Sequence, residues 1–143
     1  VFLLKKAICF TLCLLTFFIS GCNSTNFSKK STETETYVND EVSLEIKNDS
    51  IDNSGLVLLI SNKTNTDLTY DSTYYIEQKK NGVWYSSDNE QYFNALAILL
   101  ESKATNEFEV DFETTLPQGE YRIIKSINVS TGSIPLMVDF KIS

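Results

Sequence analysis

The stretch "STYYIEQKKNGVWYSS" (Ser72–Ser87) decides the fold class of this chain. Two runs rich in tyrosine, isoleucine, valine and tryptophan are separated by the dipeptide Asn81-Gly82. Asn-Gly is the strongest short signal for a β-hairpin, because both central residues of a type I′ turn need a positive φ. The sequence therefore predicts two antiparallel strands, over 72–80 and 83–87.

Apolar and polar residues also alternate on both sides of this hairpin. In "NEFEVDFE" (Asn106–Glu113) one face is phenylalanine and valine and the other is acidic, as in a half-buried strand. "FNALAILL" (Phe93–Leu100) contains helix-favouring residues, but its length and its surroundings favour a strand. The predicted strands span 42–47, 56–61, 72–80, 83–87, 93–100, 106–113, 120–129 and 134–143. About seven to eight short strands without a convincing helix predict an all-β antiparallel sandwich or barrel.

The stretch "LPQGEYRI" (Leu116–Ile123) favours the sandwich. Pro117 and Gly119 shape a turn, and Tyr121 opens the next strand. In the tyrosine corner of a Greek-key sandwich, such a phenol binds backbone a few residues upstream. We therefore predict that Tyr121 forms a structural corner, with an ordinary core tyrosine as the alternative.

Composition limits the functions that the chain can have. It has 143 residues, 42% hydrophobic and 22% charged, which is typical of one globular domain. Its formal net charge of -7 repels phosphate backbones, so nucleic acid is not an expected partner. The 3 cysteines all lie within the first 22 residues and there is no histidine. We therefore expect no catalytic residue, no metal site and no cofactor in the folded part.

The amino-terminal segment has the three parts of an export signal. Lys5 and Lys6 are followed by the apolar run Ala7–Ile19 and then by the small residues Ser20 and Gly21. As a helix this run reaches only about 20 Å, short of the roughly 30 Å hydrocarbon core of a bilayer. A permanent membrane-spanning helix is the weaker alternative.

Ile19-Ser20-Gly21-Cys22 resembles the lipobox of bacterial lipoproteins. The resemblance implies a lipoprotein signal peptide over 1–21 and a diacylglycerol, with its palmitate-type chains, on Cys22 as the first mature residue. Two or more acyl chains anchor a protein stably, whereas one chain binds only reversibly. The expected location is the extracytoplasmic face of the cell membrane. An unmodified cysteine after an ordinary export signal is the alternative.

A polar segment separates Cys22 from the predicted domain. Residues 22–40 are rich in serine, threonine, asparagine, lysine and glutamate, and contain few apolar residues. Such a composition does not offset the entropy of ordering the chain, so we predict a flexible tether spanning roughly 25 Å. The folded domain is expected over 41–143.

The stretches "GLVLLISNKTNTDLTYDSTYYIEQKKNGVWY" (Gly55–Tyr85) and "LPQGEYRI" together resemble the bacterial immunoglobulin-like domain found in exported proteins and lipoproteins of low-GC Gram-positive bacteria. The resemblance implies an immunoglobulin-like sandwich outside the membrane, with no established catalytic residues to carry over. The chain departs from the family pattern at Ser102-Lys103, where relatives tend to have Pro-Gly, and at Phe112, where tryptophan is frequent.

Aromatic residues on the two hairpin strands are candidates for a binding surface. Tyr74, Tyr75, Trp84 and Tyr85 lie there, and those on the outward face would form a small platform for a sugar or a peptide. Tyr75, Trp84 and Tyr85 are the residues predicted for ligand binding. Core packing is the alternative, because alternation sends about half of such residues inward.

Two acidic segments are better explained without a ligand. Asp49, Asp52 and Asn53 lack the spacing of a calcium loop and suit a turn whose side chains bind their own backbone. The acidic side chains of 106–113 alternate with core residues and suit an outward face that resists edge pairing.

The sequence therefore predicts a membrane-anchored, non-enzymatic recognition or structural module, with the membrane as one partner through Cys22 and an envelope protein or glycan as another. The alternative is an extracellular protease inhibitor of the sandwich type, with Ser86–Gln91 as its reactive loop. The sequence does not indicate an oligomeric state.

Overall fold

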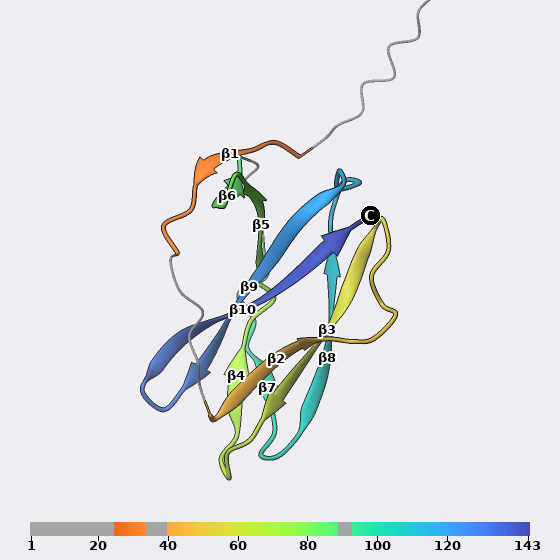
Figure 1. Ribbon diagram of the computed structural model, residues 1–143. Helices are drawn as coiled ribbons and strands as arrows, with labels where there is room; N and C mark the ends of the chain where they lie inside the picture. The colour runs from red at the N-terminus through yellow and green to blue at the C-terminus, as the bar shows by residue number, and fades with distance from the viewer. Residues whose placement is uncertain (1–24, 34–39, 89–92) are drawn as a thin grey trace, which may run out of the picture.

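The computed structural model describes residues 25–33, 40–88 and 93–143. In these ranges the chain forms strands and no helix (Figure 1). The strands are β1 (Phe27–Lys30), β2 (Val42–Ile46), β3 (Gly55–Asn62), β4 (Leu68–Tyr70), β5 (Tyr75–Lys80), β6 (Val83–Ser87), β7 (Ile98–Leu100), β8 (Thr105–Asp111), β9 (Gly119–Val129) and β10 (Gly132–Ile142). The prediction of an all-β antiparallel fold is confirmed. The described ranges contain no helix long and apolar enough to cross a membrane.

The strands form two sheets that pack face to face (Figure 1). The seven-stranded sheet has the order β1-β6-β5-β9-β4-β7, and β10 pairs with the other edge of β9. The three-stranded sheet has the order β2-β3-β8. Every pairing in both sheets is antiparallel. This two-layer arrangement is a β-sandwich.

The core lies between the two sheets and follows the period-two alternation of the strands. Tyr121, Ile123 and Ile127 on β9 are completely buried, as are Leu58 and Ile60 on β3, and all five belong to one hydrophobic cluster. Arg122, Ile124 and Ser126 of β9 lie on the opposite face of the seven-stranded sheet, which points away from the three-stranded sheet. We call this face the outer face.

The β5–β6 hairpin forms as the Asn-Gly dipeptide predicts. Asn81 has a φ of 50° and Gly82 a φ of 78°, so both central residues occupy the left-handed region. Lys80 pairs with Val83 across this two-residue turn. The turn fixes the register of β5 and β6, and thereby decides which side chains of the two strands share a face.

Strand β1 lies inside the segment that we expected to be a flexible tether. It pairs with the edge of β6, and Phe27 is only 3% exposed. The Phe27 ring meets the Tyr121 ring edge-on at 5.7 Å, and Lys80 Nζ donates a hydrogen bond of 2.6 Å to the Phe27 carbonyl oxygen. One aromatic side chain and an available sheet edge are therefore enough to order residues that their composition marks as polar linker.

Two further elements differ from the sequence prediction. The short strand β4 was not predicted, and it pairs with β7 and with the end of β9. Of the predicted strand over 93–100, only Ile98–Leu100 forms β7. The preceding residues make loop contacts instead, for example the hydrogen bond from Ser72 Oγ to the Asn94 carbonyl oxygen.

Candidate functional site: a groove beside Trp84

The aromatic residues predicted to form a platform do not lie together. Trp84 is on the outer face, whereas Tyr85, its neighbour in the chain, packs against the core on the opposite face. Tyr75 is on the outer face and 54% exposed, but it lies four positions before Lys79 on β5. Since Lys79 is the strand partner of Trp84, Tyr75 is displaced from Trp84 along the sheet. Its ring contacts Phe93 at 6.4 Å. Of the three, only Trp84 takes part in a groove with charged side chains.

That groove runs across four strands of the outer face. Trp84 on β6, Lys79 on β5, Glu120 on β9 and Lys141 on β10 occupy one row, because they pair in register from strand to strand. With Asp139 they line a groove of about 280 Å³. One row of the sheet thus brings together an aromatic ring, two ammonium groups and a carboxylate from residues 62 positions apart in the chain.

The charges along the groove are ordered by ion pairs. Glu120 lies between Lys141, 3.0 Å from its carboxylate, and Lys79, 3.8 Å from it. The contact with Lys141 and the positive charges of both lysines lower the pKa of Glu120. Lys79 Nζ also lies 5.4 Å from the centre of the Trp84 ring. A carboxylate held ionised in this way suits the binding of a polar ligand rather than proton transfer.

A buried ion pair holds Trp84 from beneath. Arg122 and Glu77, neighbours on β9 and β5, have side chains only 5% and 4% exposed, and Nη2 of Arg122 lies 2.6 Å from Oε2 of Glu77. The Arg122 guanidinium also lies 4.6 Å from the centre of the Trp84 ring. Its Nη2 donates to the Glu33 carbonyl oxygen at 2.7 Å and to Ser31 Oγ at 3.4 Å. The pair therefore joins the groove to the segment that follows β1.

A second buried cation, Lys125, lies on the inner face of β9. Its side chain is completely buried, 4.3 Å from the centre of the Phe108 ring and 5.0 Å from that of Tyr70. Its ammonium group donates to the carbonyl oxygens of Asp71 and Thr73. Burial lowers the pKa of Lys125 to about 8, against the opposing effect of the Asp71 carboxylate.

We expect the stability of the protein to rise with pH above about 8 because of Lys125. Between the folded pKa of about 8 and the ordinary lysine pKa of 10.5, the unfolded chain holds this proton more often than the folded chain does. Urea unfolding should show a free energy of unfolding that increases by about 2 kcal/mol between pH 7.5 and 9.5. The variant Lys125→Met should lack this increase.

The window ends at pH 9.5 because burial raises the pKa of Tyr74 and Tyr121, which makes their contribution to stability fall with pH near and above 10. If the free energy of unfolding changes with pH in the same way for the native chain and for Lys125→Met, Lys125 keeps its ordinary affinity for protons in the fold. That result would contradict the prediction.

Tyr121 makes the contact that defines a tyrosine corner. Its hydroxyl donates a 2.6 Å hydrogen bond to the Pro117 carbonyl oxygen, four residues upstream, and accepts one of 3.1 Å from Gln78 Nε2. The ring stacks on Phe140 at 5.5 Å. Tyr121 therefore joins the β8–β9 connection to the core.

The acidic turn before β3 binds its own backbone. Asp52 Oδ1 accepts hydrogen bonds from the backbone and hydroxyl of Ser54 and from the backbone of Gly55, and the bonds from Ser54 lower the pKa of Asp52. Among the residues that the structure describes, no group of three or more acidic, cysteine or histidine side chains is placed to hold a metal ion.

Two predicted sites fall wholly or partly outside the described residues. Cys22 is one of them. Of the predicted reactive loop Ser86–Gln91, positions 89–91 lie outside, while Ser86 and Ser87 belong to β6 and pair with β1. Asp88 accepts hydrogen bonds from Asn26 and Ser28. The described part of this segment is therefore occupied in contacts with the amino-terminal strand.

The fold and the corner together define an immunoglobulin-like sandwich domain. The family model of the bacterial Ig-like domain matches residues 30–141, so the chain belongs to this family. Among solved structures, a protein from Archaeoglobus fulgidus is similar at 10% sequence identity and a TM-score of 0.32, over 73% of this chain and 97% of that chain. No curated protein matches the sequence.

Proposed function

We propose that this protein is a bacterial lipoprotein, anchored by acylated Cys22 to the extracytoplasmic face of the cell membrane, whose Ig-like domain is a non-enzymatic recognition module. The observation that carries the recognition role is the groove beside Trp84. The lipobox-like Ile19-Ser20-Gly21-Cys22 supports the anchor. Together they describe a module that presents a small binding surface close to the membrane.

The composition of the groove indicates the kind of ligand. Trp84 offers part of an aromatic surface, while Lys79, Lys141 and Asp139 are exposed and can form hydrogen bonds or ion pairs with a ligand. Aromatic rings stack on the apolar faces of sugars, and charged side chains bind hydroxyl, carboxylate or amino groups. An envelope glycan, or a polar segment of an envelope protein, fits this combination.

Capture from envelope material tests the recognition role. Immobilised mature protein should retain an envelope component that Asp139→Ala weakens, because Asp139 lines the groove, is exposed and can be replaced without opening the core. We expect Trp84→Ala to weaken binding at least about tenfold, the typical effect of removing an aromatic side chain that carries binding energy.

Tyr75→Ala is the matched control, because Tyr75 is an exposed aromatic residue on the same face outside the groove. Recovery of no component above background would contradict the recognition role. Equal losses in Trp84→Ala and Tyr75→Ala would contradict the placement of the site in the groove.

A further inference from the structure

The folded domain begins very close to the predicted lipid anchor. Phe27, the first residue of β1, is buried, and only five peptide units separate it from Cys22. A fully extended chain spans at most about 3.6 Å per residue, so the two Cα atoms are no more than about 18 Å apart. If Cys22 carries lipid, as the proposed function requires, the β1 end of the domain is held beside the bilayer.

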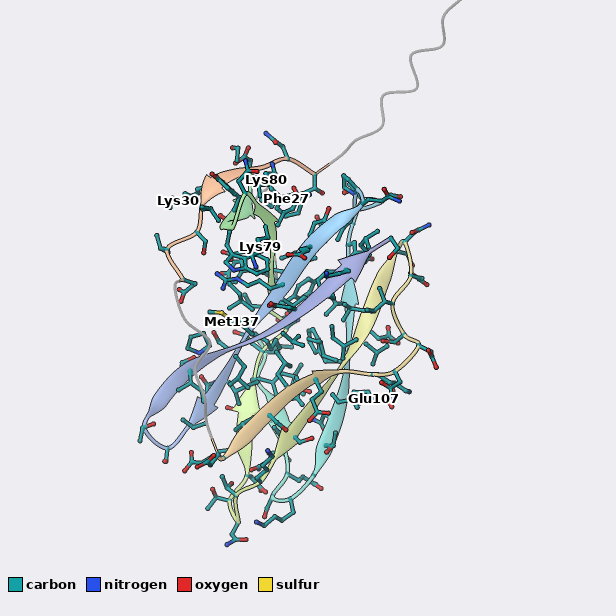
Figure 2. All side chains as sticks on the ribbon, viewed as in Figure 1. Phe27, Lys30, Lys79, Lys80, Glu107 and Met137 are labelled. Carbon is teal, nitrogen blue, oxygen red and sulfur yellow. The ribbon has the colours of Figure 1, made fainter. Side chains whose placement is uncertain are left out.

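The same end of the domain carries a group of exposed lysines. Lys29 and Lys30 lie on β1, and Lys79 and Lys80 lie at the end of β5, just before the hairpin turn. These strands flank β6, where Lys30 pairs with Tyr85 and Lys79 with Trp84. Figure 2 shows Phe27, Lys30, Lys79 and Lys80 at one end of the molecule. We call these four lysines the basic end.

The basic end concentrates positive charge in a protein that is acidic as a whole. After Cys22 the chain has 10 basic residues against 19 acidic ones, and four of those ten lie here. The described carboxylates beside it include Asp88 and Glu120. Asp88 accepts hydrogen bonds from Asn26 and Ser28, and Glu120 is paired with Lys141 as well as with Lys79. Lys29 and Lys30 form no ion pair with a carboxylate among the residues that the structure describes.

Acidic side chains gather on the other sheet. The outward positions of the three-stranded sheet carry exposed carboxylates, of which one is paired with Lys47 at 2.8 Å. They are Glu45, Glu107, Glu109 and Asp111. Glu107 lies far from the labelled lysines in Figure 2. Positive charge thus lies near the anchor and negative charge on a separate face, which is the polarity that an anionic bilayer favours.

We propose that the basic end binds anionic phospholipid headgroups and thereby fixes how the domain stands on the membrane. The β1 edge and the tip of the β5–β6 hairpin face the bilayer, and the acidic face of the three-stranded sheet points away from it. Each lysine near an anionic surface strengthens binding by about fivefold, and this effect falls with salt. The acyl chains supply the anchor, while the lysines supply the orientation.

Vesicle binding by the non-acylated protein tests this proposal. The mature chain with Cys22→Ser is mixed with phosphatidylglycerol or phosphatidylcholine vesicles, and the bound fraction is measured by sedimentation. We expect binding to phosphatidylglycerol that is lost in high salt and that 10 mM inorganic phosphate does not displace. Lys29→Gln/Lys30→Gln should weaken it by about 25-fold.

Lys63→Gln/Lys103→Gln is the control, because it makes the same change in charge in the β3–β4 and β7–β8 connections. It should change binding by less than about twofold. Equal binding to both lipids, or equal weakening by both double variants, would overturn the proposal. Displacement by inorganic phosphate would also overturn it, in favour of a site for free phosphate. Because acylation of Cys22 is measured separately by mass spectrometry, failure here would leave the proposed anchor standing.

Discussion

Replacing Cys22 by serine is expected to abolish acylation of the protein. A serine hydroxyl cannot form the thioether to diacylglycerol, so palmitate label in the protein should fall to background. The mature chain should also lose its affinity for neutral phosphatidylcholine vesicles by at least about a thousandfold, since each buried CH₂ of an acyl chain contributes about 0.8 kcal/mol. Neutral vesicles are the appropriate surface because they do not attract the lysines of the basic end.

Cys13→Ser is the matched control for this experiment. Cys13 lies within the apolar run of the predicted signal peptide, so its replacement should leave both the label and the vesicle binding unchanged. Mass spectrometry of the mature native protein should find Cys22 as the first residue with its lipid attached. A free thiol at Cys22, or a chain that retains its leader, would contradict the proposed anchor.

Local signals in the sequence were sufficient to predict most of the strands. Asn81-Gly82 predicted the hairpin because the need for two positive φ values is a property of the turn itself. Alternation predicted β2 and β8 because burial of one face repeats every second residue. β1 was missed because its stability comes from Phe27 packing on Tyr121, 94 positions later in the chain, which its own composition does not reveal.

The site was less predictable than the fold for the same reason. Trp84 and Tyr85 are adjacent aromatic residues, and the sequence alone does not distinguish their roles. Only the register of β6 decides that Trp84 lines the groove and Tyr85 packs on the core. Lys125 carried a usable signal, because a charged residue between Ile123 and Ile127 breaks an apolar face of β9. Nothing local predicted that Arg122 would meet Glu77, because that contact depends on the pairing of β5 with β9.

Breaking the ion pair between Arg122 and Glu77 should give the largest loss of stability among single substitutions on the outer face. Arg122→Met leaves the Glu77 carboxylate buried without its cation and removes the donor to the Glu33 carbonyl oxygen. Removing one partner of a buried pair typically costs 3 to 5 kcal/mol, so we expect a decrease of about 4 kcal/mol in the free energy of unfolding. Urea unfolding followed by Trp84 fluorescence measures this decrease in the free energy of unfolding. The fluorescence also reports the loss of the Arg122 contact with the indole ring.

The double variant Glu77→Leu/Arg122→Met separates the cost of an unpaired charge from the value of the pair. Replacing both partners of a buried pair by apolar residues is often neutral, so the double variant should recover at least about 2 kcal/mol of the loss. Ser31 keeps its backbone hydrogen bond to Trp84, so β1 should stay paired in both variants. If the double variant is as unstable as Arg122→Met, the loss comes instead from the contacts that Arg122 makes with Trp84 and with the segment after β1.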